Sequence, residues 1–394
     1  MHRFASRTDW SQTLNPLATA LQERRDRGLP ILDLTESNPT RCGFTYDPDE
    51  ILKALADPRS LTYSPDPRGL LAARIAIRDY YAERSVEIEP EQIFLTTSTS
   101  EAYSHVFRLL ADPGDKILVP QPSYPLFDFL ARLDVVHLAR YPLDYDDSWR
   151  IDCEGLAQNI DSRARAVLVV NPNNPTGSFL HRDELESLLE CCTSHGLALV
   201  SDEVFADYVV DEDSRARAGS LAATREVLTF TLSGLSKISA LPQMKLAWIV
   251  VNGPAEALEE SLVRLEVIAD TYLSVSAPLA RALPRLLETR RTIQPQILNR
   301  VKGNLSCLDC HLPADSPVRR LNTEGGWYAV LRLPALKGDE EWAVEIVRRE
   351  GVLSHPGHFY DFPSEGHLVV SLLTPPDIFE EGLQKMLGLV MERV

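Results

Sequence analysis

Two residues with reactive side chains, Asp202 and Lys237, follow apolar stretches of the kind that form buried strands. A carboxylate at the end of an apolar strand is poorly hydrated unless it has a cationic partner. A Lys in a semi-buried position at a sheet edge readily acquires a lowered pKa and becomes a nucleophile. Each residue alone also has a simpler interpretation, because such carboxylates are often structural and most Lys side chains lie in solvent. Together they predict a site that combines an acid with a reactive amine.

Two further segments carry polar groups that suit a ligand rich in oxygen. Ser98, Thr99 and Ser100 stand where an apolar run gives way to a helical pattern. Hydroxyls and free backbone N–H groups at a helix N-terminus can bind a phosphate, although Ser98 also has the spacing of a simple capping box. Asn174 lies in the turn Asn171-Pro-Asn-Asn-Pro-Thr-Gly177, where its amide can donate to a ligand oxygen.

These four groups match the requirements of one ligand. A phosphate site, an amide donor, a buried carboxylate and a reactive amine are what pyridoxal 5'-phosphate (PLP) needs. Its aldehyde forms a Schiff base with a Lys, and its pyridine nitrogen needs an acid partner to stay protonated and to draw electrons from the substrate. The residues therefore predict PLP as the cofactor.

Alternating apolar and amphipathic stretches predict the scaffold that must position these residues. Runs such as Ala166–Val170 are typical of central strands covered on both faces, and helical patterns such as Arg182–His195 lie between them. This alternation indicates an α/β fold with a mostly parallel seven-stranded sheet sandwiched by helices. In such sheets, ligands bind beyond the carboxyl ends of the strands. The predicted strands are Ile93–Thr97, Lys116–Val119, Val135–Ala139, Ala166–Asn171, Ala198–Asp202, Leu228–Leu232 and Leu246–Val251.

The pattern changes after about Val301. Apolar runs at Trp327–Leu333 and His367–Leu373 indicate antiparallel strands, and helical stretches flank them. We expect a smaller α+β domain that is built from both ends of the chain. The predicted division is residues 1–50 for an N-terminal segment that joins the small domain, 51–285 for the large cofactor-binding domain, and 286–394 for the small C-terminal domain.

Composition and charge limit the partners. The chain has 394 residues, of which 44% are hydrophobic and 25% charged, as in folded globular domains. The net charge of −17 argues against nucleic acid and anionic membranes as partners. No uncharged apolar run reaches the roughly 18–20 residues of a membrane span, and the first residues do not resemble a signal peptide. We therefore expect a cytoplasmic protein that acts on small molecules.

Six cysteines are too few for a disulfide framework in a chain of this length. One local pattern, Cys307-Leu-Asp-Cys310-His311, matches the C-x-x-C-H signature of haem attachment. Covalent haem usually goes with export, and no second Cys pair is present to complete a zinc site. We therefore expect neither haem nor a metal site.

The order and spacing of the motifs resemble the aspartate aminotransferase superfamily, the type I fold of PLP enzymes, class I/II subgroup. The resemblance runs from about Leu32 to Met391. Asn174 precedes Asp202 by 28 residues and Asp202 precedes Lys237 by 35, which fits that family. The motifs that carry the resemblance are Tyr63-Ser-Pro-Asp-Pro-Arg-Gly69, Pro122-Ser-Tyr124-Pro, Asn171–Gly177, Asp202-Glu-Val-Phe205 and Ser233–Lys237.

The resemblance implies a role for each matched position. Lys237 would form the Schiff base and then move protons, while Asp202 would pair with the pyridinium nitrogen. Asn174 would hydrogen-bond the ring 3-hydroxyl oxygen, and Tyr124 would stack on the ring. Tyr63 would reach the phosphate of the other subunit's cofactor, which implies a homodimer with shared active sites. The phosphate ligands within the chain would be Ser98, Thr99, Ser100 and Lys245.

Some cofactor positions depart from the family pattern. Phe205 stands where the family usually has Tyr, so one donor to the ring oxygen is lost. Lys245 replaces a phosphate-binding Arg, which keeps the charge but not the bidentate fork. Gly234 replaces a phosphate-side Ser, for which the neighbouring Ser233 is a candidate substitute.

The substrate side departs as well. Val369 stands where the family places the Arg that clamps the substrate α-carboxylate. A bidentate Arg–carboxylate pair fixes the orientation of the substrate, so another group must take over this role or the substrate is held differently. Asn38 and Arg41, in the N-terminal segment that covers the substrate in the family, are the candidates, with Arg41 as the replacement cation.

The resemblance implies an aminotransferase that moves an amino group from an amino acid or related amine to a 2-oxo acid through a Lys237 Schiff base. Two alternatives stay open. The same fold supports other PLP chemistry, such as that of a C–S lyase, a cyclase or a decarboxylase, and the departures at Phe205 and Val369 give this alternative weight beside transamination. A non-enzymatic ligand sensor is a remote alternative, because such regulators carry a fused DNA-binding domain and this chain is acidic.

Overall fold

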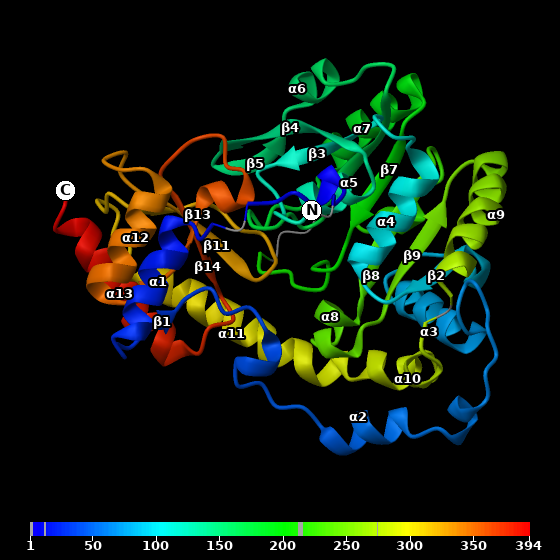
Figure 1. Ribbon diagram of the computed structural model, residues 1–394, viewed down its shortest axis with the longest axis horizontal. Coiled ribbons are helices and arrows are strands. Elements are labelled where there is room, and N and C mark those ends of the chain that lie inside the picture. Colours follow the sequence, from blue (N-terminus) through cyan, green and yellow to red (C-terminus); the bar gives the residue numbers. More distant parts are fainter. Residues whose placement is uncertain (1–2, 12, 212–215, 274) are drawn as a thin grey trace.

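A mixed sheet at the centre of the molecule carries the predicted strands (Figure 1). The computed structural model describes residues 3–11, 13–211, 216–273 and 275–394. The strands of this sheet are β2 (Ile93–Thr96), β3 (Lys116–Gln121), β4 (His137–Asp146), β5 (Ser148–Ile151), β6 (Ala164–Val170), β7 (Ala198–Asp202), β8 (Thr229–Gly234) and β9 (Ala247–Asn252). Their order is β2-β9-β8-β7-β6-β3-β4-β5. Neighbours from β8 to β4 are parallel, which confirms the predicted α/β class, while β2–β9, β8–β9 and β4–β5 are antiparallel.

All seven predicted strands are present, and the sheet has an eighth. β5 folds back on β4 as a hairpin, with Leu143 opposite Ile151 and Asp146 opposite Ser148. The strand has four residues, which is too short for a periodic apolar pattern to show. It extends the edge of the sheet farthest from Lys237 in the strand order and leaves the strand ends at the centre unchanged.

Helices cover both faces of this sheet, and strand alternation decides which core each residue joins. Leu199 packs toward α7, whereas Ala198 and Val200 pack in the cluster that contains residues of α4. The helices of this part of the chain are α2 (Pro48–Leu55), α3 (Leu71–Ala82), α4 (Thr99–Leu110), α5 (Phe127–Leu133), α6 (Cys153–Gln158), α7 (Arg182–His195), α8 (Leu235–Ile238), α9 (Ala255–Tyr272) and α10 (Ala277–Glu288). α4, α5 and α9 contribute to one apolar cluster, and α6 and α7 contribute to another.

A smaller antiparallel sheet forms beside the C-terminal helices, as the sequence predicts. Its order is β10 (Arg319–Arg320), β11 (Tyr328–Arg332), β14 (His367–Ser371) and β13 (His355–Pro356). The remaining strands, β1 (Leu32–Asp33) and β12 (Val352–Leu353), pair in parallel. The helices of both chain ends are α1 (Pro16–Asp26), α11 (Arg290–Cys310), α12 (Asp339–Glu350) and α13 (Pro376–Met391).

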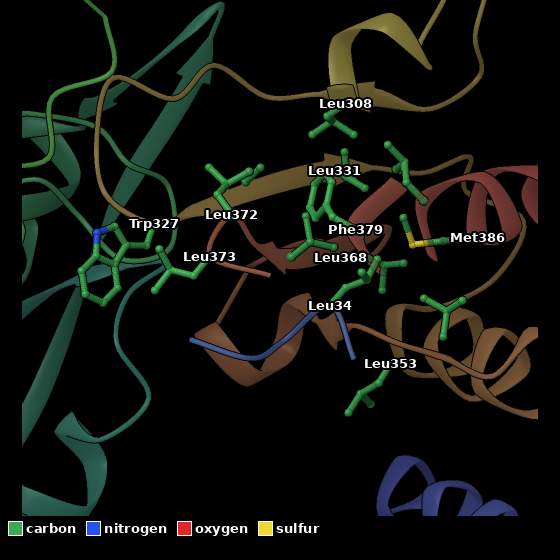
Figure 2. Close-up of a cluster of buried hydrophobic side chains, with 14 of the residues drawn as sticks. Leu34, Leu308, Trp327, Leu331, Leu353, Leu368, Leu372, Leu373, Phe379 and Met386 are labelled. Carbon is green, nitrogen blue, oxygen red and sulfur yellow. The ribbon is translucent and has the colours of Figure 1, made fainter. Parts of the chain in front are cut away.

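One apolar core joins the two ends of the chain. Figure 2 shows Leu34, from the N-terminal part, among Leu368, Phe379 and Met386 of the C-terminal part, and all four are buried. The exact division at residues 50 and 285 stays a prediction. None of the helices in the described ranges combines the length and the apolar character needed to cross a membrane.

Gly177 closes the Asn-rich turn after β6 and docks it on the loop before β11. Its φ is +72°, and a Cβ there would lie 2.4 Å from the backbone oxygen of Gly325. The amides of Glu324 and Gly325 donate to its carbonyl at 3.2 and 2.9 Å, so the loop cannot simply move away. The turn therefore requires glycine at this position.

We expect Gly177→Ala to lower the free energy of unfolding by about 2–4 kcal/mol, because the new methyl group adds a backbone clash to left-handed strain. Urea denaturation measures this change. Gly303→Ala is the control: Gly303 lies inside α11 with open space at its Cβ position, so this variant should be as stable as the wild type or more stable. Equal urea midpoints for Gly177→Ala and the wild type would contradict the prediction.

Candidate active site

A cavity of about 280 Å³ opens at the carboxyl ends of β6, β7 and β8. The strand-end residues Val170, Asp202 and Gly234 line it. They share a sheet face with the residues two positions earlier on each strand, which pack in the cluster with α4. The site therefore lies where ligands bind in open α/β sheets. Its other lining residues are Ser37, Thr99, Tyr124, Asn174, Val204, Phe205, Ser236, Lys237, Ala247 and Tyr328.

Asp202 is a buried carboxylate with two donors. The Tyr103 hydroxyl donates to its Oδ2 at 2.7 Å, and the Val204 amide donates to its Oδ1 at 3.1 Å. Burial raises the pKa of Asp202, and the two hydrogen bonds and the charge of Lys237 oppose that rise. The carboxylate is therefore aimed and held by groups that favour its ionised form.

Lys237 belongs to the short helix α8, and its side chain lines the cavity. Its Nζ lies 4.8 Å from the centroid of the Trp327 ring and 5.2 Å from that of Phe205. Burial lowers the pKa of Lys237 to about 8, and the charge of Asp202 opposes this shift. The Tyr208 hydroxyl donates to the Lys237 carbonyl at 2.6 Å, which fixes the backbone of α8. The amine is thus available in its neutral form near neutral pH.

Asn174 and Tyr124 approach the cavity from two neighbouring loops. The Oδ1 of Asn174 is buried and has no hydrogen-bond partner among the described residues. A buried amide oxygen without a partner is unusual and needs an explanation. Asn173 ties the two loops together, because its Nδ2 donates to the Pro122 carbonyl at 3.1 Å. Tyr124 is half-buried and packs edge-on against Phe127, with ring centroids 5.8 Å apart.

Of the four residues of this chain that are predicted to bind the phosphate, one lines the cavity and three do not. Thr99 lines the cavity as the first residue of α4. Ser98 is the cap of that helix and accepts the Glu101 amide at 3.2 Å, as the capping-box alternative predicts. Ser100 is half-buried, and Lys245 is exposed with a φ of +49°. Within this chain, neither Ser98, Ser100 nor Lys245 lines the cavity.

The predicted substrate residues and Tyr63 lie outside the cavity wall of this chain. The Oδ1 of Asn38 accepts the Thr40 amide at 3.1 Å and so caps the 3₁₀ turn Pro39–Arg41, on which Arg41 is exposed. Ser37, next to Asn38, does line the cavity. The side chain of Tyr63 is 76% exposed. Of the nine predicted cofactor residues, the cavity therefore brings together Thr99, Tyr124, Asn174, Asp202 and Lys237.

Val369 is buried at the position where the family resemblance leads us to expect an Arg. It pairs with Val330 across β11 and β14 and belongs to an apolar cluster with Tyr360 and Phe362. Among the described residues that line the cavity, Lys237 is the sole cation. A carboxylate-bearing substrate therefore needs a cation from beyond this wall.

Several site residues escape prediction from the sequence. Tyr103 lies one helical turn after Thr99, so the start of α4 already places it on the cavity face, and this spacing is a usable signal. Tyr328 lines the cavity but belongs to an apolar strand without a polar pattern, and Ser236 lies in the Ser233–Lys237 motif but is given no role there. Ser233, our candidate substitute for the phosphate-side Ser, faces away: it borders a different cavity on the other face of the sheet.

Comparison with known proteins agrees with this geometry. The sequence profile of aminotransferase class I and II matches residues 30–380. Over 382 residues the chain is 27% identical to the glutamate-pyruvate aminotransferase AlaA of Escherichia coli, covering 94% of this chain and 93% of the relative. It is also 27% identical over 354 residues to an S-alkyl-thiohydroximate lyase of Arabidopsis thaliana, covering 86% and 75%.

The solved structures give the same result for the fold. An alanine aminotransferase from Pyrococcus furiosus superposes with a TM-score of 0.86 at 23% identity, covering 99% of this chain and all of that one. The sequence profile spans most of the chain, and the cavity lies at the strand ends that the motifs predict. The protein is therefore an enzyme of the aminotransferase class I and II family, a family that uses PLP.

Proposed function

We propose that the protein binds PLP and transfers the amino group of a small amino donor to a 2-oxo acid, with Lys237 and Asp202 as its catalytic residues. The observation that carries this proposal is that an amine of lowered pKa and a buried carboxylate border the same cavity. Perturbed titratable groups in one cleft are typical of a catalytic site.

The residues of the cavity fit the cofactor. Asn174 has a buried amide oxygen without a partner among the described residues, and its amide can turn to present the NH₂ group to the ring oxygen. Thr99 and the N-terminus of α4 suit a phosphate, and the aromatic ring of Tyr124 suits the pyridine ring. PLP, when bound, supplies an electron sink that stabilises negative charge on the substrate carbon.

Each catalytic residue then has a defined task. The Lys237 amine would hold the cofactor and, when free, would take and return the proton at the substrate carbon. The Asp202 carboxylate would stabilise a proton on the ring nitrogen. The hydrogen bond that the Tyr103 hydroxyl donates to this carboxylate fixes its orientation. Phe205, Trp327 and Tyr328 surround the amine with aromatic surface and keep water away from it.

Attachment of PLP to the apoenzyme should follow the titration of Lys237. Only the neutral amine reacts, and a pKa of about 8 leaves about a quarter of it neutral at pH 7.5, against about 0.1% for an ordinary Lys. The rate should rise with pH and level off above about pH 8, as measured by stopped-flow absorbance. Asp202→Asn removes the charge that holds the pKa up and should shift the profile to lower pH. A rate that still climbs at pH 10 would refute the assignment.

The reaction type is tested by adding one amino donor at a time to the PLP-loaded enzyme without an oxo acid. Conversion of the bound cofactor to its pyridoxamine form supports transamination, and glutamate and alanine come first because the relatives use them. Release of ammonia with pyruvate from a sulfur-bearing donor would instead indicate elimination. The lyase among the relatives and the buried Val369 favour this second candidate.

Arg41 is the proposed replacement for the missing carboxylate clamp. It is exposed on the 3₁₀ turn next to Ser37, which lines the cavity. A charge-assisted hydrogen bond contributes about 1.5–3 kcal/mol, so Arg41→Ala should raise the KM for the donor about tenfold or more with little change in kcat. Steady-state kinetics measures both, with Arg25→Ala on α1 as an exposed control. Unchanged kinetics would remove Arg41 from the site.

A homodimer is the expected assembly, and its partner would complete the site. Tyr63 and Leu61, with exposed fractions of 76% and 92%, lie together on one loop, where a second copy would cover them. Tyr63 would then reach the partner's phosphate site. The cytoplasm stays the predicted location.

A further inference from the structure

A second cavity, of about 360 Å³, lies behind the active site. Asn171, Glu203 and Ser233 line it, and each is adjacent in sequence to a strand-end residue that lines the active-site cavity. Successive residues of a strand point to opposite faces, so the ends of β6, β7 and β8 border both cavities. Tyr80 and Tyr81 of α3, Arg182 of α7 and residues 217–220 form other parts of its wall.

The carboxylate of Glu203, the acid in this cavity, already accepts three hydrogen bonds from within the protein. The Oε1 of Glu203 accepts the Leu221 amide at 2.7 Å and the Ser201 hydroxyl at 3.0 Å, and its Oε2 accepts the Ser220 hydroxyl at 2.6 Å. Burial raises the pKa of Glu203 to about 7, although these three hydrogen bonds act to lower it. Glu203 is the sole carboxylate among the described residues that line the cavity, so the wall offers no open counterion.

Three arginines, Arg84, Arg182 and Arg217, line the same cavity. Arg84 forms an ion pair with Asp207. Arg217 is 7% exposed, its Nη2 donates to the Asp211 carbonyl at 2.8 Å, and its Nε has no hydrogen-bond partner among the described residues. Arg182 donates its Nε to the Arg217 carbonyl at 3.1 Å. Arg182 is exposed at the rim, and within the described ranges neither Arg182 nor Arg217 forms an ion pair with a carboxylate.

Among the described residues, the buried guanidinium of Arg217 therefore has no carboxylate partner. The Phe179 ring, 4.7 Å from the Arg217 guanidinium, accounts for only part of the cost of burying it. A buried charge normally has a partner of opposite sign. The chain is rich in such partners, since its net charge is −17. The missing partner points to a ligand.

We propose that this second cavity binds a small oxyanion, the carboxylate or phosphate group of a metabolite, with Arg217 and Arg182 as its ligands. Guanidinium groups bind both kinds of anion through paired hydrogen bonds. The volume lies within the range of small-molecule sites, about 300–1,000 Å³. The aromatic walls, Phe179 and Tyr81, suit the carbon skeleton of such a molecule. The site is separate from the proposed chemistry and does not depend on it.

The test uses the PLP-loaded enzyme with inorganic phosphate and succinate as separate probes. Calorimetry should show saturable binding of at least one probe at one site per chain, and the same probe should raise the melting temperature. The tighter of the two identifies the group. The absorbance of the bound cofactor should stay unchanged, because a probe in the active site would alter it.

The variant Arg217→Met should weaken this binding at least tenfold, while Arg225→Met, at an exposed arginine outside the cavity, should not. Ala218→Asp places a carboxylate in the cavity wall and should abolish binding even if Arg217→Met does not fold. The proposal is overturned if neither probe binds, if a folded Arg217→Met or Ala218→Asp binds as the wild type does, or if binding changes the cofactor absorbance.

Discussion

Lys237→Ala should remove the visible absorbance of PLP linked to the enzyme and lower transaminase activity by at least about 10³-fold, because the nucleophile and the proton carrier are lost together. The truncated side chain lines a cavity, so we expect the fold to persist. Absorbance of the purified protein, circular dichroism and a coupled assay measure these effects.

A matched variant and a rescue experiment separate chemistry from folding. Lys53→Ala, at an exposed Lys of α2, should behave as the wild type. Added methylamine should restore part of the lost activity in Lys237→Ala, since it can replace the missing amine in the open cavity. Full activity and a retained absorbance band in Lys237→Ala would show that another residue holds the cofactor.

Asp202→Asn should lower kcat by about 10²–10⁴-fold with a smaller change in KM, because a neutral amide cannot stabilise a proton on the ring nitrogen. The change keeps the shape of the side chain but replaces one of the two carboxylate oxygens, of which Oδ2 accepts from Tyr103 and Oδ1 accepts from Val204. Steady-state kinetics and the absorbance of the bound cofactor as a function of pH report the effect.

Tyr103→Phe is the graded comparison for this carboxylate. It leaves the charge of Asp202 in place but removes the hydrogen bond that opposes the rise of its pKa, so that pKa should go up. We expect a loss in kcat of about tenfold, consistent with one hydrogen bond to a charged group. Wild-type kcat in Asp202→Asn would show that the ring nitrogen does not need this partner.

Local pattern accounts for most of the scaffold. Continuous apolar runs are typical of strands buried on both faces, and for this reason Ala166–Val170 could be recognised as a central strand without any structure. The helix Arg182–His195 has the predicted bounds, because apolar spacing defines its buried face and Gly196, with a φ of +64°, ends it. The hairpin strand β5 lacked such a signal, since it has one partner and four residues.

The sequence alone determines the class of the enzyme, the strand ends that carry its chemistry and the alternation that turns Asp202 and Glu203 to opposite faces. These properties depend on residue type and on spacing along the chain. Only the tertiary structure decided that Tyr103 binds Asp202, that Val369 packs in an apolar cluster, and that a cavity lined by the buried Arg217 lies behind the site. Such contacts join residues about a hundred or more positions apart, or surround one residue with several elements. They depend on how whole elements pack, which local spacing does not encode.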